Sequence, residues 1–250
     1  NGVATESPFK HGVASGDPLQ DRVILWTRVT PLSLDDGDIP VTVLVADDAD
    51  FQSNVQSYPA SAIRARDWTV KVDFSGLAAG KRYYYRFEAL GQTSPVGRTQ
   101  TAADDPTQIR FAVVSCSNFP NGYFNAYRFI AERDDLDMVL HLGDYLYEYG
   151  GGEGDRTHEP PREILTLEDY RVRHAQYKGD ADLAAAHAAH PWITVWDDHE
   201  STNNSRRDSA ENHTEGDEGV WAIRKAWAQQ AYDESVSYTH LRAHETSLHL

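Results

Sequence analysis

The sequence predicts two domains, a β-sandwich followed by an α/β domain with parallel strands. The first hundred residues contain short β-branched and aromatic runs separated by turn signals, a pattern typical of a sandwich. After about residue 108, nearly continuous apolar runs alternate with helical segments, which indicates βαβ units. The pattern changes at residues 101–107, a polar stretch that contains a proline and that we interpret as a linker.

The strands of the first domain are predicted from the alternation of apolar and polar residues and from the turn signals between these runs. Gly, Pro and Asp clusters at residues 15–18, 35–38 and 78–81 separate runs in which apolar and polar residues tend to alternate. The predicted strands cover residues 23–29, 41–46, 68–74 and 82–90. We therefore assign residues 9–100 to the sandwich.

The second domain, residues 108–234, opens with a βαβ unit. Residues 109–116 form an apolar run that predicts a strand buried on both faces. An amphipathic stretch at residues 123–134 predicts a helix, and residues 137–144 predict a second buried strand. A third buried strand is expected at residues 191–196. Helices are expected at residues 166–178, 180–187 and 219–234.

Composition excludes several classes of protein. Among 250 residues, 23 Lys and Arg stand against 39 Asp and Glu, a formal charge of −16, so we expect no specific nucleic-acid binding. A single cysteine, Cys116, excludes an intrachain disulfide and a cysteine-rich zinc site. The apolar stretches are too short for a transmembrane segment.

The two ends of the chain need separate interpretation. The first residues show no signal peptide. Residues 235–250 resemble a peptide that recurs at the broken ends of metagenomic reads, and we interpret them as a non-native tail. The alternative is a histidine-rich metal site with His240, His244 and His249.

Chemically active side chains follow each predicted strand of the second domain. Cys116 ends the first strand, Asp144 ends the second, and Asp198 and His199 follow the third. Because ligands bind outside the carboxyl ends of strands in open α/β sheets, we expect these residues to meet at one edge. The alternative is that residues 197–200 form an ordinary acidic loop.

The residue types point to two different metal ions. Tyr147 lies three residues after Asp144 and can fold back toward the same ion. A phenol with a pKa of ~10 needs a strong Lewis acid to ionise at neutral pH, and a thiolate favours iron or zinc. Asp144 and Asp198 suit a harder second ion such as calcium, manganese or magnesium. Such a pair activates water for attack on phosphorus, with His199 beside it as a transition-state or leaving-group contact.

Four motifs carry a resemblance to a known family. Residues 9–31, 115–127 (SCSNFPNGYFNAY), 141–150 (HLGDYLYEYG) and 196–204 (WDDHESTNN) resemble the PhoD-type alkaline phosphatase and phosphodiesterase family. The resemblance spans residue 9 to about residue 234. It implies an immunoglobulin-like sandwich, a calcineurin-like metallophosphoesterase domain, ferric iron (Fe3+) with calcium (Ca2+), and export to the cell envelope. It also implies hydrolysis of phosphate mono- and diesters when phosphate is scarce, and we expect a monomer.

The resemblance also implies residue roles. Cys116, Asp144 and Tyr147 match the iron ligands, with Asp144 bridging to the second metal. Asp198 matches a ligand of that second metal, and His199 matches the histidine that contacts the phosphate. Asn118 and Asn203 are candidates for calcium or phosphate contacts.

The sequence departs from the family in one respect. Motifs for the further strands and metal ligands do not appear, so the second domain is expected to be incomplete. The iron would lack a carboxylate, the sheet would have an uncovered edge liable to aggregate, and this chain alone would be weak or inactive.

Two other functions compete with the phosphoesterase. An iron-dependent oxidase would also use Cys and Tyr ligands, although the set of two histidines and one carboxylate is absent at this edge. A non-catalytic cell-surface binding module would use Trp26, Trp68 and the tyrosines at residues 83–85 as exposed rings. We interpret His187 and His190 as members of a solvated helix face rather than as a metal pair.

Overall fold

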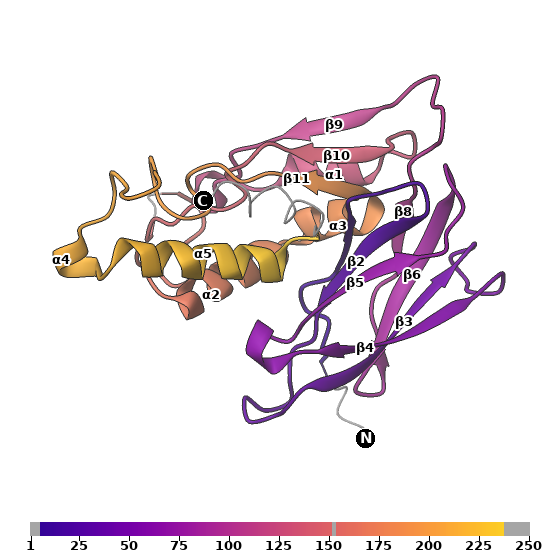
Figure 1. Cartoon of the computed structure of the whole chain (residues 1–250), viewed down its shortest axis with the longest axis horizontal. Coiled ribbons are helices and arrows are strands. Elements are labelled where there is room, and N and C mark those ends of the chain that lie inside the picture. Colours follow the sequence, from indigo (N-terminus) through magenta and orange to yellow (C-terminus); the bar gives the residue numbers. More distant parts are fainter. Residues whose placement is uncertain (1–5, 152–153, 238–250) are drawn as a thin grey trace.

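The computed structural model describes residues 6–151 and 154–237. The predicted non-native tail lies outside the described residues from residue 238 onward. Within the described part, no helix is long and apolar enough to cross a membrane. Figure 1 shows the strands of the sandwich at the lower right of the view and the C-terminal helices, in yellow, at the left.

The first domain is an antiparallel β-sandwich, as predicted. All four predicted strands are present within two residues of their expected ends, and the strands that the sequence did not reveal are short or exposed. The complete set is β1 (Val13–Gly16), β2 (Arg22–Arg28), β3 (Ile39–Ala46), β4 (Gln56–Ala62), β5 (Thr69–Ser75), β6 (Arg82–Ala89), β7 (Gln92–Thr93) and β8 (Gly97–Gln100). Residues such as Leu25, Val43 and Phe87 alternate into the core between the sheets, where each is fully buried.

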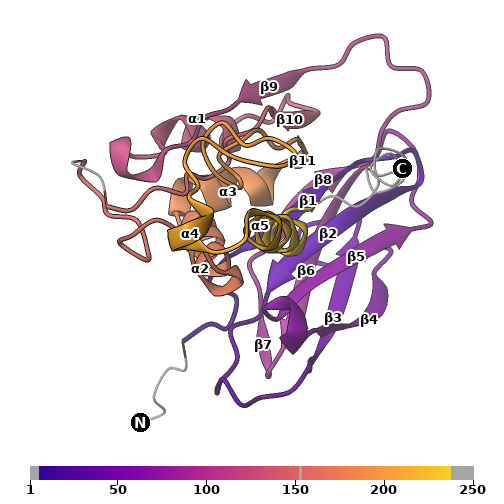
Figure 2. The same cartoon turned by 60° about the vertical axis from the view of Figure 1, so that its left-hand side comes forward.

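The second domain contributes three parallel strands, again as predicted. These are β9 (Phe111–Val114), β10 (Met138–His141) and β11 (Pro191–Thr194). They do not form a separate sheet, because β1 pairs in parallel with β11 and extends the sheet through β2 to β5. Figure 2 shows β1 beside β11. The sheet that supports the candidate site is therefore continuous with one sheet of the sandwich, and the domain boundaries given above stay a prediction.

The helices cover one face of the parallel strands. They are α1 (Asn125–Ala131), α2 (Leu167–Lys178), α3 (Ala181–Ala189), α4 (Glu215–Glu218) and α5 (Trp221–Ser235), with short 3-10 turns at Arg64–Arg66 and Phe119–Asn121. The capping box of Thr166 and Asp169 begins α2 at the predicted residue. Side chains of α1 and α3 pack on Val139 and Trp192 to form the core of this domain.

The opposite face of these strands is exposed, although the sequence predicted that it would be buried. Residues 109–116 were expected to be buried on both faces, yet Phe111 is 48% exposed and Val113 is 54% exposed. β9 is the edge strand, and among the described residues only its other face packs on helices. Leu142 and Val195 are exposed like Phe111 and Val113, so a bare apolar surface crosses the ends of three strands.

His187 and His190 also differ from expectation. Both are almost fully buried rather than solvated. The Nε2 atom of His190 donates to the carbonyl oxygen of Ile130 at 2.9 Å, which ties α3 to α1. The ring of His187 stacks on Trp192 at 3.9 Å between centroids. Each histidine is therefore a structural link inside the domain.

Candidate metal centre

The strand exits that carry Cys116 and Asp144 are hydrogen-bonded to each other. The amide of Cys116 donates to the carbonyl of Gly143 at 3.1 Å, and the amide of Ser117 donates to the carbonyl of Asp144 at 2.9 Å. Cys116 and Asp144 both have positive φ, at 57° and 53°, which is uncommon for residues other than glycine. This geometry turns the chain sharply at the end of β9 and β10 and directs both side chains to one place.

Three side chains with groups that can bind a metal ion converge on this turn. The Sγ of Cys116 lies 3.4 Å from Oδ2 of Asp144, and the hydroxyl of Tyr147 donates to the same oxygen at 3.3 Å. The Oδ1 atom of Asp144 is buried and has no hydrogen-bond partner among the described residues. Burial raises the pKa of Tyr147, and the nearby charge of Asp144 raises it further. A buried carboxylate oxygen without a partner is a group for which a cation would compensate.

Gly143 brings the exit of β11 against that of β10. Its φ is +99°, and a Cβ atom at this position would lie 2.6 Å from Cβ of Asp197 and 2.7 Å from the Asp197 amide nitrogen. Only glycine permits this approach of the two segments. As a result, Asp198 and His199 stand next to Asp144.

The third segment completes a group of possible ligands. One ligand atom each from Asp144, Asp198 and His199 lie within 4.8 Å of one another. The amide of Asn204 donates to Oδ2 of Asp198, which holds that carboxylate in place. Asn204 itself has a φ of +51°, so the chain turns tightly around Asp198.

His199 is fixed by aromatic rings and by a carboxylate. Its ring lies 4.3 Å from the ring of Tyr147 and 5.3 Å from that of Tyr149. Its Nδ1 atom donates to Oε2 of Glu148 at 2.7 Å. Burial opposes the protonated imidazole, but the hydrogen bond to Glu148 and the charges of Glu148, Asp144 and Asp198 outweigh it and raise the pKa of His199.

The two asparagines lie at different distances from this group. Asn118 follows Cys116 closely, and its buried Oδ1 atom has no hydrogen-bond partner among the described residues. It lines an open hollow of about 630 Å³ together with Cys116, Tyr123 and Tyr147. For Asn203, the structure gives a contact of the backbone, whose amide donates to Oε1 of Glu148 at 2.7 Å.

Sequence reasoning assigned no role to two buried carboxylates beside the site. Glu148 is fully buried, and Glu200 is 2% exposed. Glu200 accepts hydrogen bonds from the amides of Tyr145 at 2.6 Å and Asp197 at 2.8 Å, so it joins the two loops. Burial raises the pKa of Glu200 to about 7. Both residues lie inside the quoted motifs, but the partners of Glu148 and the Tyr145 partner of Glu200 are 51 to 55 residues away in sequence, which no local pattern reveals.

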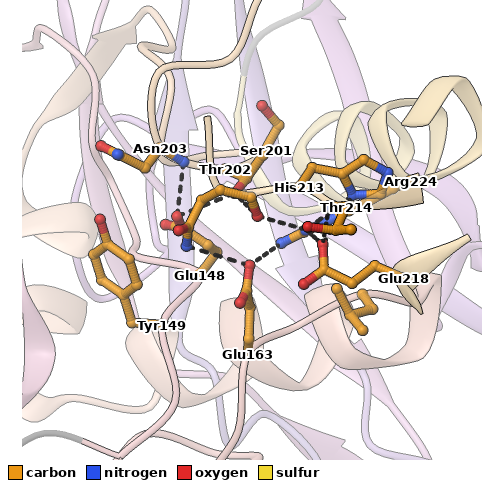
Figure 3. A network of polar contacts seen from close by, with 12 residues as sticks. Glu148, Tyr149, Glu163, Ser201, Thr202, Asn203, His213, Thr214, Glu218 and Arg224 are labelled. Atoms are coloured by element: carbon orange, nitrogen blue, oxygen red, sulfur yellow. Dashed lines mark hydrogen bonds and ion pairs between the residues drawn. The ribbon is translucent and has the colours of Figure 1, made fainter. Parts of the chain in front are cut away.

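A network of polar contacts holds the loop that follows His199. Arg224 of α5 is 1% exposed and donates to Oε1 of Glu163 at 2.7 Å and to Oε2 of Glu218 at 3.2 Å. It also donates to the carbonyl of Asn212 at 3.4 Å. Figure 3 shows Glu163 and Glu218 on either side of Arg224, with Glu148 below Thr202 and Asn203. The loop is thus fixed at Glu148 near the site and at Arg224 farther away.

The donor set fits a metal centre. Cys116, Tyr147 and Asp144 offer a thiol, a phenol and a carboxylate, and Asp198 adds a second carboxylate. A thiol and a phenol suit a strongly Lewis-acidic ion, whereas carboxylates suit a harder ion. The set can therefore hold two metal ions of different character. The chain therefore contains an Asp and His group able to bind metal, extended by Cys116 and Tyr147.

Comparison with known proteins identifies the family. The family described as PhoD-like phosphatase matches residues 111–247, more than half of the chain. The chain belongs to this family. The N-terminal domain of PhoD-like phosphatases matches residues 2–103, which covers the sandwich.

Individual relatives agree with this assignment. Alkaline phosphatase D of Bacillus subtilis (strain 168) is 44% identical over 244 residues, which cover 92% of this chain and 41% of that protein. A solved structure of PhoD is 41% identical with a TM-score of 0.86 and covers 96% of this chain and 48% of its own. The chain thus spans less than half the length of these PhoD-like relatives.

A more distant structure shows the same fold. The purple acid phosphatase PPD1 from yellow lupin (Lupinus luteus) seeds has a TM-score of 0.55 at 15% identity. The match covers 87% of this chain and 39% of that one. The chain therefore combines an antiparallel β-sandwich with part of a metallophosphoesterase domain, as the sequence predicted.

Proposed function

We propose that this PhoD-like protein hydrolyses phosphate mono- and diesters with a metal-activated water molecule, and that it works outside the cytoplasm. The observation that carries the proposal is the convergence of Cys116, Asp144, Tyr147 and Asp198 at the carboxyl ends of three parallel strands. Together with the family assignment, this convergence favours phosphoryl transfer over other metal chemistry.

The residues divide between two ions. Cys116 and Tyr147 would hold ferric iron, Asp198 would hold calcium, and Asp144 would bridge the two. When bound, such a pair polarises a phosphoryl oxygen and supplies hydroxide for in-line attack. The unpartnered Oδ1 of Asp144 and the thiol and phenol on its Oδ2 support a role for this carboxylate in holding metal, because a cation would compensate a buried carboxylate oxygen that lacks a hydrogen bond.

The chain's own groups would bind and orient the ester. His199 uses Nδ1 for Glu148, so its Nε2 atom is left to contact a phosphate oxygen or to protonate the leaving oxygen. Asn118 lines the adjacent hollow and is placed to bind a phosphate oxygen or calcium. Asn203 is held on the neighbouring turn by its amide and would contribute from that side.

An assay without oxygen distinguishes hydrolysis of a phosphate ester from the activity of an iron-dependent oxidase. The chain is incubated with bis-p-nitrophenyl phosphate and iron plus calcium, without oxygen. Weak turnover that Asp144→Asn and Cys116→Ser each abolish supports the proposal, whereas turnover that survives both substitutions contradicts it. Because the chain spans less than half the length of its PhoD-like relatives, we expect weak turnover from this chain alone.

Metal identity needs its own readout. A thiolate or phenolate bound to ferric iron gives a visible absorption band. Loading with iron should produce such a band, which Tyr147→Phe alters and which calcium alone does not produce. Absence of any band after stoichiometric iron uptake would overturn the iron assignment while leaving hydrolysis open.

The binding-module alternative loses its main support. Trp26 is 1% exposed, Trp68 is 7% exposed and Tyr85 is fully buried, so none of these rings faces solvent, and Trp68 and Tyr85 belong to the core of the sandwich. Trp26 also donates through its indole nitrogen to the carbonyl of Glu234 at 2.8 Å. They do not form an exposed aromatic platform.

A further inference from the structure

The segment that follows Asn118 forms one wall of the hollow beside the candidate metal centre. Residues 119–124 contain a 3-10 turn and lead into α1. The hollow of about 630 Å³ is lined by Cys116 and Tyr147, which belong to the proposed metal centre, and also by Tyr123. This volume lies in the range of small-molecule sites and exceeds what a phosphate group alone occupies. Space is therefore left for the organic group of a phosphate ester.

Tyr123 differs in exposure from the other aromatic residues that line this hollow. It is 64% exposed, whereas Phe124 is 8% exposed and Tyr127 is 5% exposed. Tyr147 is half-buried. A ring that lines a hollow and is accessible to water offers a flat apolar surface to another ring. Tyr123 is therefore the ring of this lining that is best placed to contact a ligand.

Arg156 holds the segment that carries Tyr123. Its Nε atom donates to the carbonyl oxygen of Phe119 at 3.0 Å, and its Nη2 atom donates to the carbonyl oxygen of Gly122. Its Nη1 atom donates at 2.7 Å to Asp180, the residue that caps α3. The guanidinium also lies over the ring of Tyr123, 5.2 Å from the ring centroid. One side chain thus contacts both the backbone of the turn and the exposed ring.

Two further contacts fix the same turn. A Cβ atom at Gly154 would lie 1.7 Å from the carbonyl oxygen of Pro120, so the loop after β10 packs closely against the turn where it has glycine. The amide of Phe119 donates to the hydroxyl of Tyr177 at 3.0 Å, and Tyr177 is fully buried. Because the turn is already held at these points, little order has to be gained when a ligand contacts it.

We propose that Tyr123 is a specificity-determining residue whose ring stacks on the organic group of the phosphate ester and favours a planar aromatic ring there. The inference deepens the proposed function, because it rests on a phosphate group held at the metal centre next to the hollow. Stacking needs a flat π face rather than particular hydrogen bonds, so it tolerates many ring structures. The preferred substrates are therefore phosphate esters of alcohols that carry an aromatic ring.

Phosphonates test this preference without hydrolysis, because their organic group is joined to phosphorus by carbon and not by an ester oxygen. Phenylphosphonate and cyclohexylphosphonate have the same charged group and rings of equal size, but only the phenyl ring is flat. Their dissociation constants for the full chain are measured by isothermal titration calorimetry with iron and calcium present. We expect phenylphosphonate to bind roughly 2- to 10-fold more tightly, the advantage of an aromatic pair over equal apolar contact.

Three variants locate the source of the preference. Tyr123→Ala removes the ring and should weaken binding of phenylphosphonate at least about fivefold, so that its advantage over cyclohexylphosphonate disappears. Tyr123→Phe keeps the ring and should keep the advantage. Tyr58→Ala is the matched control, since Tyr58 is a 52% exposed tyrosine of β4 in the sandwich, and it should change neither affinity.

The outcomes separate this inference from the proposed function. The inference is overturned if the wild type binds neither phosphonate or binds both equally. It is also overturned if the preference survives Tyr123→Ala, or is lost in Tyr123→Phe or Tyr58→Ala. The wild-type comparison decides it even where a variant does not fold. If the preference depends on Tyr123 but no ester is hydrolysed, the proposed function fails and the binding role of Tyr123 stands. If esters are hydrolysed and the preference is absent, the inference fails and the proposed function stands.

Discussion

The Sγ atom of Cys116 and the Oδ2 atom of Asp144 lie 3.4 Å apart at the ends of two neighbouring strands, although 28 residues separate them in sequence. Cys116 is exposed, whereas Asp144 is 7% exposed. The thiol is therefore open to reagents while its partner carboxylate is not, and a metal bound between them would cover it.

This relationship predicts that metal protects the thiol. Alkylation of Cys116 by iodoacetamide should slow at least tenfold when iron is bound, because a ligating thiolate is not a free nucleophile. Asp144→Asn should abolish the protection, since the bridging carboxylate is lost. Asp73→Asn makes the same exchange of a carboxylate for an amide in β5 of the sandwich. It serves as the control, and iron should still protect Cys116 in this variant. Equal alkylation rates with and without iron would contradict the ligand assignment.

A second prediction concerns Gly143. Substitution by alanine places a Cβ atom 2.6 Å from Cβ of Asp197, so the exits of β10 and β11 must separate. We expect a loss of more than about 2 kcal/mol in the free energy of unfolding, measured with urea. The matched control is Gly91→Ala, which has a φ of +70° but no atom within 4 Å of the added carbon. Its cost should be about 1 kcal/mol, that of the backbone alone. Equal costs would show that the close approach does not matter.

These residues show how far sequence reasoning reaches. Cys116, Asp144 and Asp198 could be placed together because strand ends of a parallel sheet share an edge, and the structure brings them there. The partners of His199 could not be found, because Glu148 is 51 residues away and its motif gives no sign of the direction of its side chain. The orientation of the His199 ring depends on how side chains pack around it, and the spacing of residues in the sequence does not reveal that packing.

Burial was harder to predict than element type. Residues 111–114 form a strand as expected, but their exposure depends on what lies against them, and the described helices cover only one face. His187 and His190 were expected to be solvated because histidine on a short helix usually is. They are buried instead, because α3 packs against α1 and β11 on those faces.

A third prediction follows from the burial of Lys178. Its Nζ atom lies 3.2 Å from Nε2 of His187 and faces the rings of Trp26 and Tyr145. Burial, and then the charge of Lys71, lower the pKa of Lys178 from 10.5 to about 7. Between pH 7 and 10 the unfolded chain therefore binds more protons at this residue than the folded chain does. Stability should rise with pH in this window, by up to ~1.4 kcal/mol per pH unit from one such group.

The variant Lys178→Met isolates this contribution. Methionine has a similar length and no charge, and the pKa of His187 is lowered by burial so that it stays neutral throughout the window. Urea unfolding from pH 6 to 10 should show a steeper rise in stability for the wild type than for the variant. Parallel curves would mean that Lys178 keeps an ordinary pKa in the folded protein.

The last prediction concerns the bare surface on β9. Phe111 and Val113 are about half exposed on an edge strand, and such edges favour association with other chains. We expect the apparent mass measured by light scattering to rise with protein concentration, and Val113→Lys to suppress the rise because a charge on an edge strand opposes pairing. Leu32→Lys makes the same exchange at a loop residue that is 81% exposed and should have little effect. If both variants suppress association equally, the exposed edge of β9 is not the surface through which the chains associate.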